Sequence, residues 1–339
     1  MPLIDAPEVE IDRELNDDLS NAFSIDSGNI IDQYGLCWSL WRVDGLDAWW
    51  RFFEETINAP MGRRLANAAC DEEEWLLNSG QIDVSGIFKK KKMELALKNR
   101  WTLHGWGKPL SNPFGIESSP LTPIGAGLLQ AGIERQHAKR YRMRWEDKSS
   151  NLAIINFTPS TAPLVPAGPP PNSLNLQKGQ PWDMEFETAL KIDGQRHCLL
   201  PAGLFRRLED ACAGLVGNIS SDERAAWPEK EDGFLALAIA SYRLFIAGEE
   251  LFLAVDSDSW VDCVDSVFGS RGLSAPSIVE SIDSNGGIKL TFEFLPFGPI
   301  SIGYLAGAWT RCEGRPVKVE LITEQTRSIV ILTSRHSLA

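Results

Sequence analysis

Two stretches of this 339-residue chain share one layout, and this repetition constrains the fold more than any other feature of the sequence. Residues 299–334, PISIGYLAGAWTRCEGRPVKVELITEQTRSIVILTS, predict an amphipathic helix, a tight Gly-Arg-Pro turn and two short strands. Residues 123–158, PIGAGLLQAGIERQHAKRYRMRWEDKSSNLAIINFT, follow the same order. The chain is therefore expected to use one helix-and-hairpin unit twice.

Within the unit, the two copies share identical residues such as Pro123/Pro299 and Gly127/Gly303. The two halves also match outside the unit. Further matches pair 37–45 with 186–194, 49–62 with 204–217, 100–107 with 289–296, and the Pro-Phe-Gly triplets at 113–115 and 296–298. Because the matches keep the same order along the chain, they favour a tandem duplication. The alternative is that two unrelated α+β domains share common helix and strand patterns.

The predicted fold class is α+β, with two similar domains, each an antiparallel sheet with helices packed on it, related as a pseudo-symmetric tandem duplication. Residues 1–30 are acidic and predict a flexible lead-in or a strand-like arm. The first domain is expected over 31–158 and the second over 182–335. Between them, 159–181 is rich in proline and predicts an extended, semi-rigid linker.

Hydrophobic periodicity predicts most of the individual elements. Helices are expected over 46–60, 61–77, 89–97, 124–137, 199–217, 233–248 and 257–269, the last with Ser257 or Ser259 as its N-cap. Alternation predicts strands over 36–43, 100–106, 140–145, 183–194 and 288–297. The segment 250–255 is read as a strand or a helix end. The acidic run 71–74 is interpreted as a solvated helix surface, because four adjacent carboxylates cannot all face one ion.

The composition excludes several functional classes. A net charge of -13 disfavours binding to nucleic acids and to anionic membranes, because the mean field repels polyanions. No apolar run is long enough for a membrane span, and the acidic N-terminus lacks the order of a signal peptide, which predicts a cytoplasmic location. The six cysteines form no CxxC pair and no HExxH motif occurs, so no metal site is expected.

Short motifs in the second half carry a family resemblance. They are Ala306-Gly307, the turn Gly314-Arg315-Pro316-Val317, Glu320, and the upstream segment 196–217 with its strand, Leu-Leu-Pro and helix. This pattern resembles the vinyl-reductase (4-vinyl reductase) domain, and 126–129, Glu134 and Trp145-Glu146 match it more loosely in the first half. The resemblance implies an antiparallel sheet with helices on one side. It also implies membership of a wider group of α+β ligand-binding folds that includes haem-based NO-binding domains and TRAPP subunits. It also implies a small-molecule pocket or a protein-docking surface. The final hairpins here hold no Cys or His, which argues against the zinc site of the family's phenol sensors.

Two side-chain groups are candidate binding sites. A dense aromatic cluster could line an apolar ligand pocket or form an interface, although core packing is the alternative. Its members are Trp38, Trp41, Trp49, Trp50 and Phe53. A strand face with Arg140, Arg142 and Arg144 could contact an anion or an acidic partner. The alternative is a solvated strand face whose charges prevent edge pairing.

The sequence contains no arrangement of catalytic residues that stands out, and it names no cofactor. The leading hypothesis is a non-catalytic protein that binds a small apolar molecule or a protein partner through two vinyl-reductase-like domains. One alternative is a structural scaffold subunit, which could form a homo-oligomer. The other is a reductase-related enzyme or accessory factor, an inference from family analogy alone.

Overall fold

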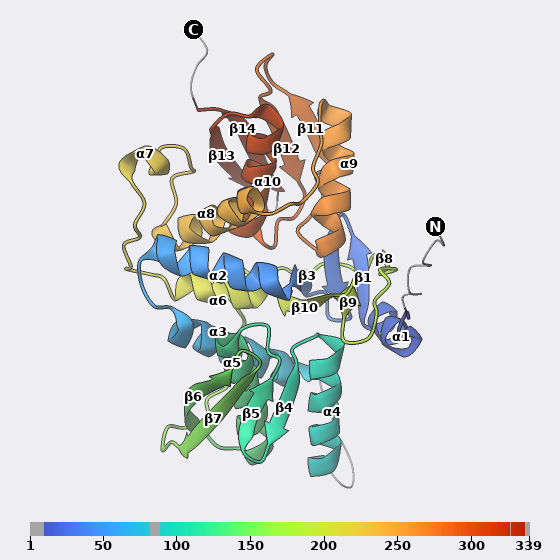
Figure 1. Ribbon diagram of the computed structural model, residues 1–339, viewed down its shortest axis with the longest axis vertical. Helices are drawn as coiled ribbons and strands as arrows, with labels where there is room; N and C mark the ends of the chain where they lie inside the picture. The colour runs from blue at the N-terminus through green and yellow to red at the C-terminus, as the bar shows by residue number, and fades with distance from the viewer. Residues whose placement is uncertain (1–9, 82–88, 326, 336–339) are drawn as a thin grey trace, which may run out of the picture.

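The computed structural model describes residues 10–81, 89–325 and 327–335, in which three antiparallel sheets and their helices form three layers along the long axis (Figure 1). The middle layer contains the largest sheet and two helices, α2 (Val43–Ile57) and α6 (Ala202–Asp210). One lobe lies below this layer and one above it. The expected α+β class with antiparallel sheets and helices is confirmed.

The middle sheet takes strands from both halves of the chain, in the order β8-β1-β2-β3-β10-β9. Its strands are β1 (Phe23–Asp26), β2 (Asn29–Asp32), β3 (Cys37–Arg42), β8 (Gln180–Pro181), β9 (Lys191–Ile192) and β10 (Gln195–Pro201). At its centre β3 and β10 run antiparallel, with Leu40 opposite Leu199. Strands of the two expected domains therefore share one sheet.

The described part of the acidic N-terminal region, from residue 10 onwards, contains a helix and a strand. Helix α1 (Arg13–Ala22) begins at Asp12, whose carboxylate caps it by accepting a hydrogen bond from Leu15 N. Leu15 and Leu19 are buried, and the chain then enters β1. Residues 10–30 are thus part of the folded body, and residues 1–9 of the expected arm lie outside the described residues.

The lower lobe follows α2 in the chain. Its helices are α3 (Gly62–Leu76), the short π-helix η1 (Leu77–Gln81), α4 (Lys89–Leu103) and α5 (Thr122–His137). Its sheet has the order β4-β5-β7-β6, with β4 (Lys108–Ser111), β5 (Phe114–Glu117), β6 (Tyr141–Ser149) and β7 (Leu152–Pro159). The expected strand over 100–106 is wrong, because α4 continues through Leu103. Arg100, Trp101 and His104 are all buried, which the spacing i, i+1, i+4 allows on one helix face.

The upper lobe repeats this sheet order as β11-β12-β14-β13. Its strands are β11 (Ile278–Ser281), β12 (Ile288–Phe292), β13 (Val317–Glu324) and β14 (Arg327–Ser334). Its helices are α7 (Ser221–Arg224), α8 (Asp232–Ala247), α9 (Ser257–Val267), η2 (Gly269–Arg271) and α10 (Gly298–Glu313). The residue that caps α9 is Asp256 rather than Ser257 or Ser259, and Ser259 completes a capping box. Residues 250–255 form neither a strand nor a helix end.

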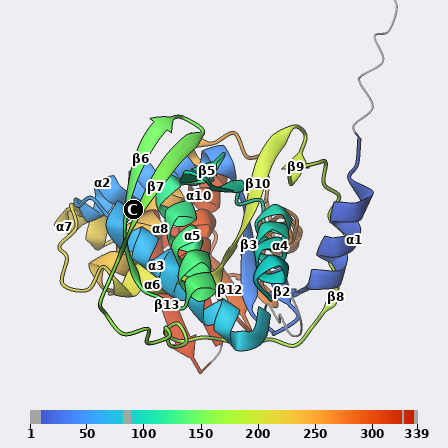
Figure 2. The same ribbon diagram turned by 90° about the horizontal axis from the view of Figure 1, so that it is seen from below.

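Each lobe is built on a close pair of helices (Figure 2). In the lower lobe α5 packs on α3, and a Cβ added to Gly127 would lie 2.1 Å from Ala66 O. In the upper lobe α10 packs on α8, and a Cβ at Gly303 would lie 2.1 Å from Ala238 O. Both contacts require glycine, because no real Cβ approaches an oxygen so closely.

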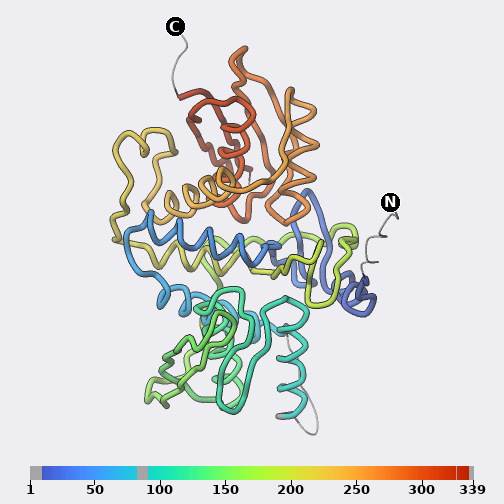
Figure 3. The backbone as a smooth tube through the Cα atoms, in the orientation of Figure 1, coloured from blue at the N-terminus to red at the C-terminus, as the bar shows by residue number. Residues whose placement is uncertain are grey.

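The middle helices cross to the opposite halves. Helix α2 comes from the first half but packs on α8, whereas α6 comes from the second half and packs on α3. The Trp49 side chain of α2 donates from Nε1 to Ser241 Oγ of α8 at 2.9 Å. The two halves are therefore interlocked through the middle layer, as the backbone trace shows (Figure 3).

The acidic run of α3 is buried, so its interpretation as a solvated surface is wrong for Glu72, Glu73 and Glu74. Successive residues of a helix point about 100° apart, and each carboxylate therefore meets an arginine from a different element. Glu72 pairs with Arg207 at 2.8 Å, Glu73 with Arg100 at 2.7 Å, and Glu74 with Arg140 at 3.0 Å. Only Asp71 is exposed.

The proline-rich segment 159–181 is fastened to this arginine row. Arg140 donates to Val165 O and Arg207 donates to Gly168 O. Ala167 N donates to Glu74 Oε2 at 3.3 Å. The segment ends in β8, which pairs with β1, and therefore ties the lower lobe to the middle sheet.

The expected strand over 183–194 forms only at Lys191–Ile192. Before it, Ala189 and Leu190 adopt positive φ angles of 63° and 54°, which interrupt an extended strand. Phe186 and Leu190 are nevertheless fully buried. Their apolar character thus reflects anchoring of a loop in the core.

Candidate functional site

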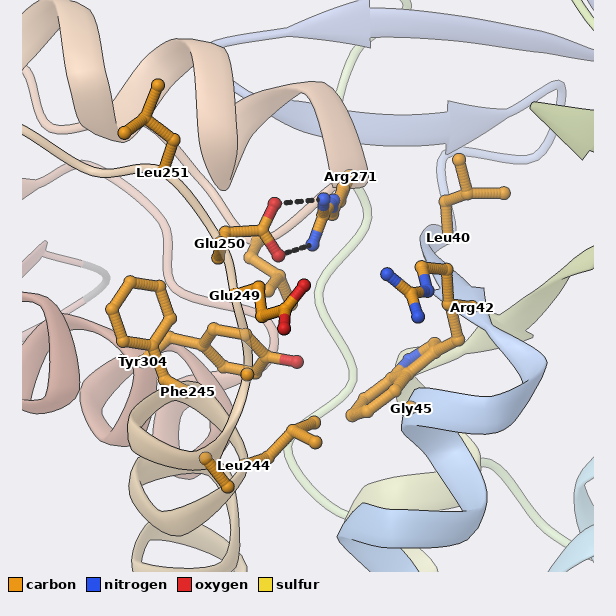
Figure 4. A pocket seen from close by; sticks show the side chains of 14 residues that line it. Leu40, Arg42, Gly45, Leu244, Phe245, Glu249, Glu250, Leu251, Arg271 and Tyr304 are labelled. Atoms are coloured by element: carbon orange, nitrogen blue, oxygen red, sulfur yellow. Dashed lines mark hydrogen bonds and ion pairs between the residues drawn. The ribbon is translucent and has the colours of Figure 1, made fainter. Parts of the chain in front are cut away.

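A pocket lies between the middle layer and the upper lobe (Figure 4). Its volume is about 630 Å³, within the range of small-molecule sites. One wall comes from the end of β3 and the start of α2, with Trp41, Arg42 and Gly45. The other wall comes from the end of α8, residues 248–251, η2 and α10. The interlocked halves thus both contribute to this site.

Arg42 ends β3 and directly precedes α2. Its guanidinium donates from Nε to Asp44 Oδ1 at 3.0 Å and from Nη2 to Asp44 Oδ2 at 2.5 Å. This pair lowers the pKa of the Asp44 carboxyl and raises the pKa of Arg42. An arginine has five N–H donors, so the bond to Asp44 leaves donors that can serve a ligand in the pocket.

A second arginine is held on the opposite wall. Arg271 of η2 forms a two-pronged ion pair with Glu250, in which Nη1 donates to Oε2 at 2.9 Å and Nη2 donates to Oε1. The Glu249 carboxylate points into the pocket beside this pair. The pocket lining contains two arginines and two glutamates, and Asp44 beside Arg42 adds a further negative charge, so the site has no excess of positive charge.

Tyr304 supplies a hydrogen-bonding group from α10. The residue is 7% exposed, and its hydroxyl points into the pocket towards Arg42. Burial raises the pKa of the Tyr304 phenol, although Arg271 and Arg42 oppose the shift. The hydroxyl therefore stays protonated at neutral pH, and it can both donate and accept a hydrogen bond.

The remaining lining is apolar. It consists of Leu40, Trp41, Leu244, Phe245, Leu251 and Leu273 together with small residues. The arrangement therefore offers an apolar wall, a donor side at Arg42 and Tyr304, and an acceptor at Glu249. This is the composition expected of a site for an organic molecule with an apolar body and a polar head.

The structure divides the predicted aromatic cluster between two places. Trp41 lines the pocket and stacks on Phe205, with ring centroids 5.6 Å apart. Trp49, Trp50 and Phe53 are buried on the inner face of α2. Successive residues of a strand point to opposite faces, so Trp38 and Trp41, three positions apart in β3, lie on opposite faces of the sheet.

Trp38 belongs to a second aromatic group. Its ring lies 4.6 Å from His104 and 6.4 Å from Trp106, measured between centroids, and Phe23 meets it edge-on at 5.8 Å. This group adjoins a smaller pocket of about 340 Å³ that also contains Asp32. Burial lowers the pKa of His104 and raises the pKa of Asp32.

The three predicted arginines also differ in their surroundings. Arg140 bridges Glu134 at 2.6 Å and Glu74 at 3.0 Å, so its role in the structure is to hold the lower lobe together. Arg142 and Arg144 are exposed on β6, an outer strand of its sheet. None of the three lines the large pocket.

The polar residues of the pocket were not among the predicted ones. Arg42, Glu249, Arg271 and Tyr304 lie in four separate parts of the sequence and belong to no local motif. Asp44 was a local signal for Arg42, because a carboxylate two residues after an arginine can hold its guanidinium in place. Only the fold brings Glu249, Arg271 and Tyr304 close to Arg42.

Two further observations concern the described part of the chain. Within residues 10–81, 89–325 and 327–335, no group of three or more His, Cys, Asp or Glu side chains is placed to hold a metal ion. In the same ranges, no helix has both the length and the apolar character needed to cross a bilayer.

The comparisons with known proteins give no match. No family model, curated protein sequence or solved structure is significantly similar to this chain. The argument for function therefore rests on the pocket itself.

Proposed function

We propose that this protein binds a small organic molecule in the pocket between β3 and α10. The ligand has an apolar, aromatic body that packs on Trp41 and the leucines, and a head with a carbonyl or carboxylate oxygen. That oxygen accepts hydrogen bonds from Arg42 and Tyr304, and a donor group on the ligand faces Glu249. The role is binding rather than catalysis.

The observation that carries this proposal is the hydroxyl of the largely buried Tyr304 side chain, which points into the pocket towards Arg42. The pocket is open at this hydroxyl, so a ligand can reach it. A single ligand oxygen between Tyr304 and Arg42 would accept hydrogen bonds from both side chains.

We also propose that the two halves are a pseudo-symmetric duplication. The support comes from the shared sheet order, the paired helices with their glycine contacts, and the reciprocal packing of α2 and α6. Under this correspondence the strand equivalent to β3 is β10, which leads into α6 as β3 leads into α2. Residues 37–45 should then be aligned with β10 at Gln195–Pro201 and the start of α6, rather than with 186–194.

The duplication gives the pocket a counterpart in the lower lobe. Leu128 and Tyr304 each lie five positions after the matched prolines, Pro123 and Pro299 (128 − 123 = 304 − 299 = 5). The cavity beside Leu128 has a volume of only about 10 Å³, and Trp106 is among the residues that enclose it. The lower lobe thus has a filled core where the upper lobe borders a pocket, which favours a specialised site at the upper lobe.

The vinyl-reductase resemblance remains a hypothesis that agrees with a ligand-binding role. A ligand pocket is one of the two features that the resemblance implies. A structural subunit stays the alternative, in which the pocket would have no ligand and the molecule would act through its surface.

The test uses three probes of the same shape: naphthalene-2-carboxylate, its amide and naphthalene. Saturation-transfer NMR should detect binding of the first two more strongly than binding of naphthalene. Tyr304→Phe should weaken carboxylate binding by up to about tenfold, because a hydrogen bond contributes roughly 0.5–1.5 kcal/mol. Circular dichroism should show an unchanged fold.

A blocking variant locates the site. A Cβ at Gly45 would lie 3.7 Å from Arg42 Cβ, an ordinary contact, so Gly45→Leu should fold and place its side chain in the pocket. The matched control is Gly298→Leu, since a Cβ there meets nothing within 4 Å. Binding that survives Gly45→Leu would place the site elsewhere, and no binding of any probe to a folded protein would contradict the ligand class.

A further inference from the structure

A second surface of the upper lobe begins where the pocket wall ends. Between α8 and α9, residues 249–255 (EELFLAV) run outside any helix or strand. Phe252 and Ala254 are buried, whereas Leu251, Leu253 and Val255 are 76%, 72% and 91% exposed. The alternation gives the segment one face in the core and one apolar face in solvent.

The inner side of this segment is firmly held. Arg311 donates from Nη1 to Glu250 O at 2.7 Å, and the Cys263 thiol donates to Leu253 O at 3.3 Å. The Phe252 ring packs against Trp260 and Phe268, with centroids 5.0 and 5.5 Å away. The outward direction of the three large side chains is therefore fixed by the fold, so the apolar face does not result from loose packing.

We define the apolar stripe as Leu251, Leu253 and Val255. Single exposed apolar residues are normal, but a row of three on one fixed segment forms a patch of the kind that marks an interaction site. A partner that covers the stripe would remove these three apolar side chains from water, which favours binding.

The charges around the stripe determine which partner fits. Residues 246–270 contain six carboxylates, of which Glu250 is paired with Arg271 and Glu249 points into the pocket. Arg311 lies against the inner side of the segment. The other four carboxylates follow the stripe: Asp256, Asp258, Asp262 and Asp265. All four are exposed. A second copy of the chain in a two-fold contact would bring these like charges together, which is unfavourable.

We infer that the apolar stripe docks a short segment of another protein that carries two or three large apolar side chains flanked by lysines or arginines. The apolar side chains cover Leu253 and Val255. The basic residues lie over the carboxylates at the start of α9 and raise the association rate. Leu253 and Val255 do not line the ligand pocket, whereas Glu249, Glu250 and Leu251 do.

The probe is a phage-displayed library of random 12-residue peptides, selected on the full chain. The expected peptides contain apolar residues flanked by lysines or arginines. Synthetic fluorescein-labelled copies are then measured by anisotropy. Leu253→Ser/Val255→Ser should weaken binding at least tenfold, and raising the salt concentration should weaken it further because the flanking charges become screened.

A matched control removes an apolar side chain from a different exposed site. Val216 is 82% exposed and lies outside this segment, so Val216→Ser should leave peptide binding unchanged. Thermal melts of all variants confirm that the fold is intact. Tyr304→Phe should also leave peptide binding unchanged, which separates this inference from the ligand proposal.

Five results would overturn the inference. They are the recovery of no binding peptide, the recovery of peptides without basic flanks, equal binding to Leu253→Ser/Val255→Ser, self-association that this double variant abolishes, and phosphatidylcholine-vesicle binding that it abolishes. Sedimentation velocity measures the last two. Self-association through the stripe would identify a second copy as the occupant, and vesicle binding would identify a lipid surface.

Discussion

The ion pair between Glu73 and Arg100 gives the sharpest test of how the lower lobe is held together. The two side chains are 1% and 8% exposed, and they meet through two hydrogen bonds of 2.7 and 2.8 Å. The Arg100 guanidinium also lies over the Trp106 ring, 5.2 Å from its centroid. The pair therefore joins α3 and α4 through two buried side chains.

Arg100→Met removes the cation and leaves the Glu73 carboxylate buried without its partner. Loss of one member of a buried pair costs about 3–5 kcal/mol. Native proteins of this kind are stable by roughly 5–15 kcal/mol, so we expect a large decrease in the free energy of unfolding. Methionine keeps most of the packing volume beside Trp106, so the decrease reports mainly on the uncompensated charge.

The double variant Glu73→Leu/Arg100→Met separates charge from packing. Replacement of a whole buried pair by apolar residues is often neutral or stabilising by about 1–4 kcal/mol. The double variant should therefore be more stable than Arg100→Met alone, although it carries one more substitution. Urea denaturation followed by tryptophan fluorescence and circular dichroism measures the free energy of unfolding of each protein.

The control is an exposed pair. Arg51 and Asp47 are 3.4 Å apart with side chains 73% and 57% exposed, so Arg51→Met should cost less than about 1 kcal/mol. A cost of similar size for Arg100→Met would refute the reasoning, because it would mean that solvent reaches Glu73. A double variant less stable than Arg100→Met would also refute it.

Two further predictions concern packing and pH. Gly127→Ala and Gly303→Ala should each lower the free energy of unfolding by about 1–3 kcal/mol. The new Cβ would lie 2.1 Å from Ala66 O or Ala238 O, so the helices of each pair would have to move apart. Thermal melts measure the effect, and an unchanged melting temperature in either variant would contradict this packing. Burial raises the pKa of Glu72 to about 7 from its usual 4.5, so the native state holds a proton that the unfolded chain releases. Stability should therefore decrease as pH rises from 4.5 to 7, by up to about 3 kcal/mol from this group, and the loss should be absent in Glu72→Gln. Denaturation curves at several pH values check this, and equal pH dependence in the two proteins would exclude Glu72 as the cause.

Local sequence signals were sufficient for many elements. The helices predicted over 124–137 and 233–248 correspond to α5 and α8. An apolar stretch of this length is longer than an ordinary strand and therefore indicates a helix. The alternating residues from 141 to 145 form part of β6 as predicted. These elements depend on residues close together in the chain.

The errors occurred where a short pattern fits more than one structure. The stretch 100–106 alternates like a strand, yet Arg100 and His104 belong to the buried face at the end of α4. The acidic run after Asp71 resembles a solvated surface, yet its glutamates pair with arginines up to 135 positions away. Neither the ion pairs nor the helix–helix contacts that select these structures can be seen in a local window.

The sequence by itself determined the helix-and-hairpin units, the antiparallel α+β class and the concentration of aromatic residues near the start of the first half. Only the tertiary structure decided that strands from both halves form one middle sheet and that α2 and α6 cross to opposite partners. The candidate site depends on that crossing, since it places Arg42 opposite Tyr304, residues 262 positions apart (304 − 42 = 262). Local propensity acts over a few residues, whereas a pocket is formed by whichever surfaces the packing of whole elements brings together.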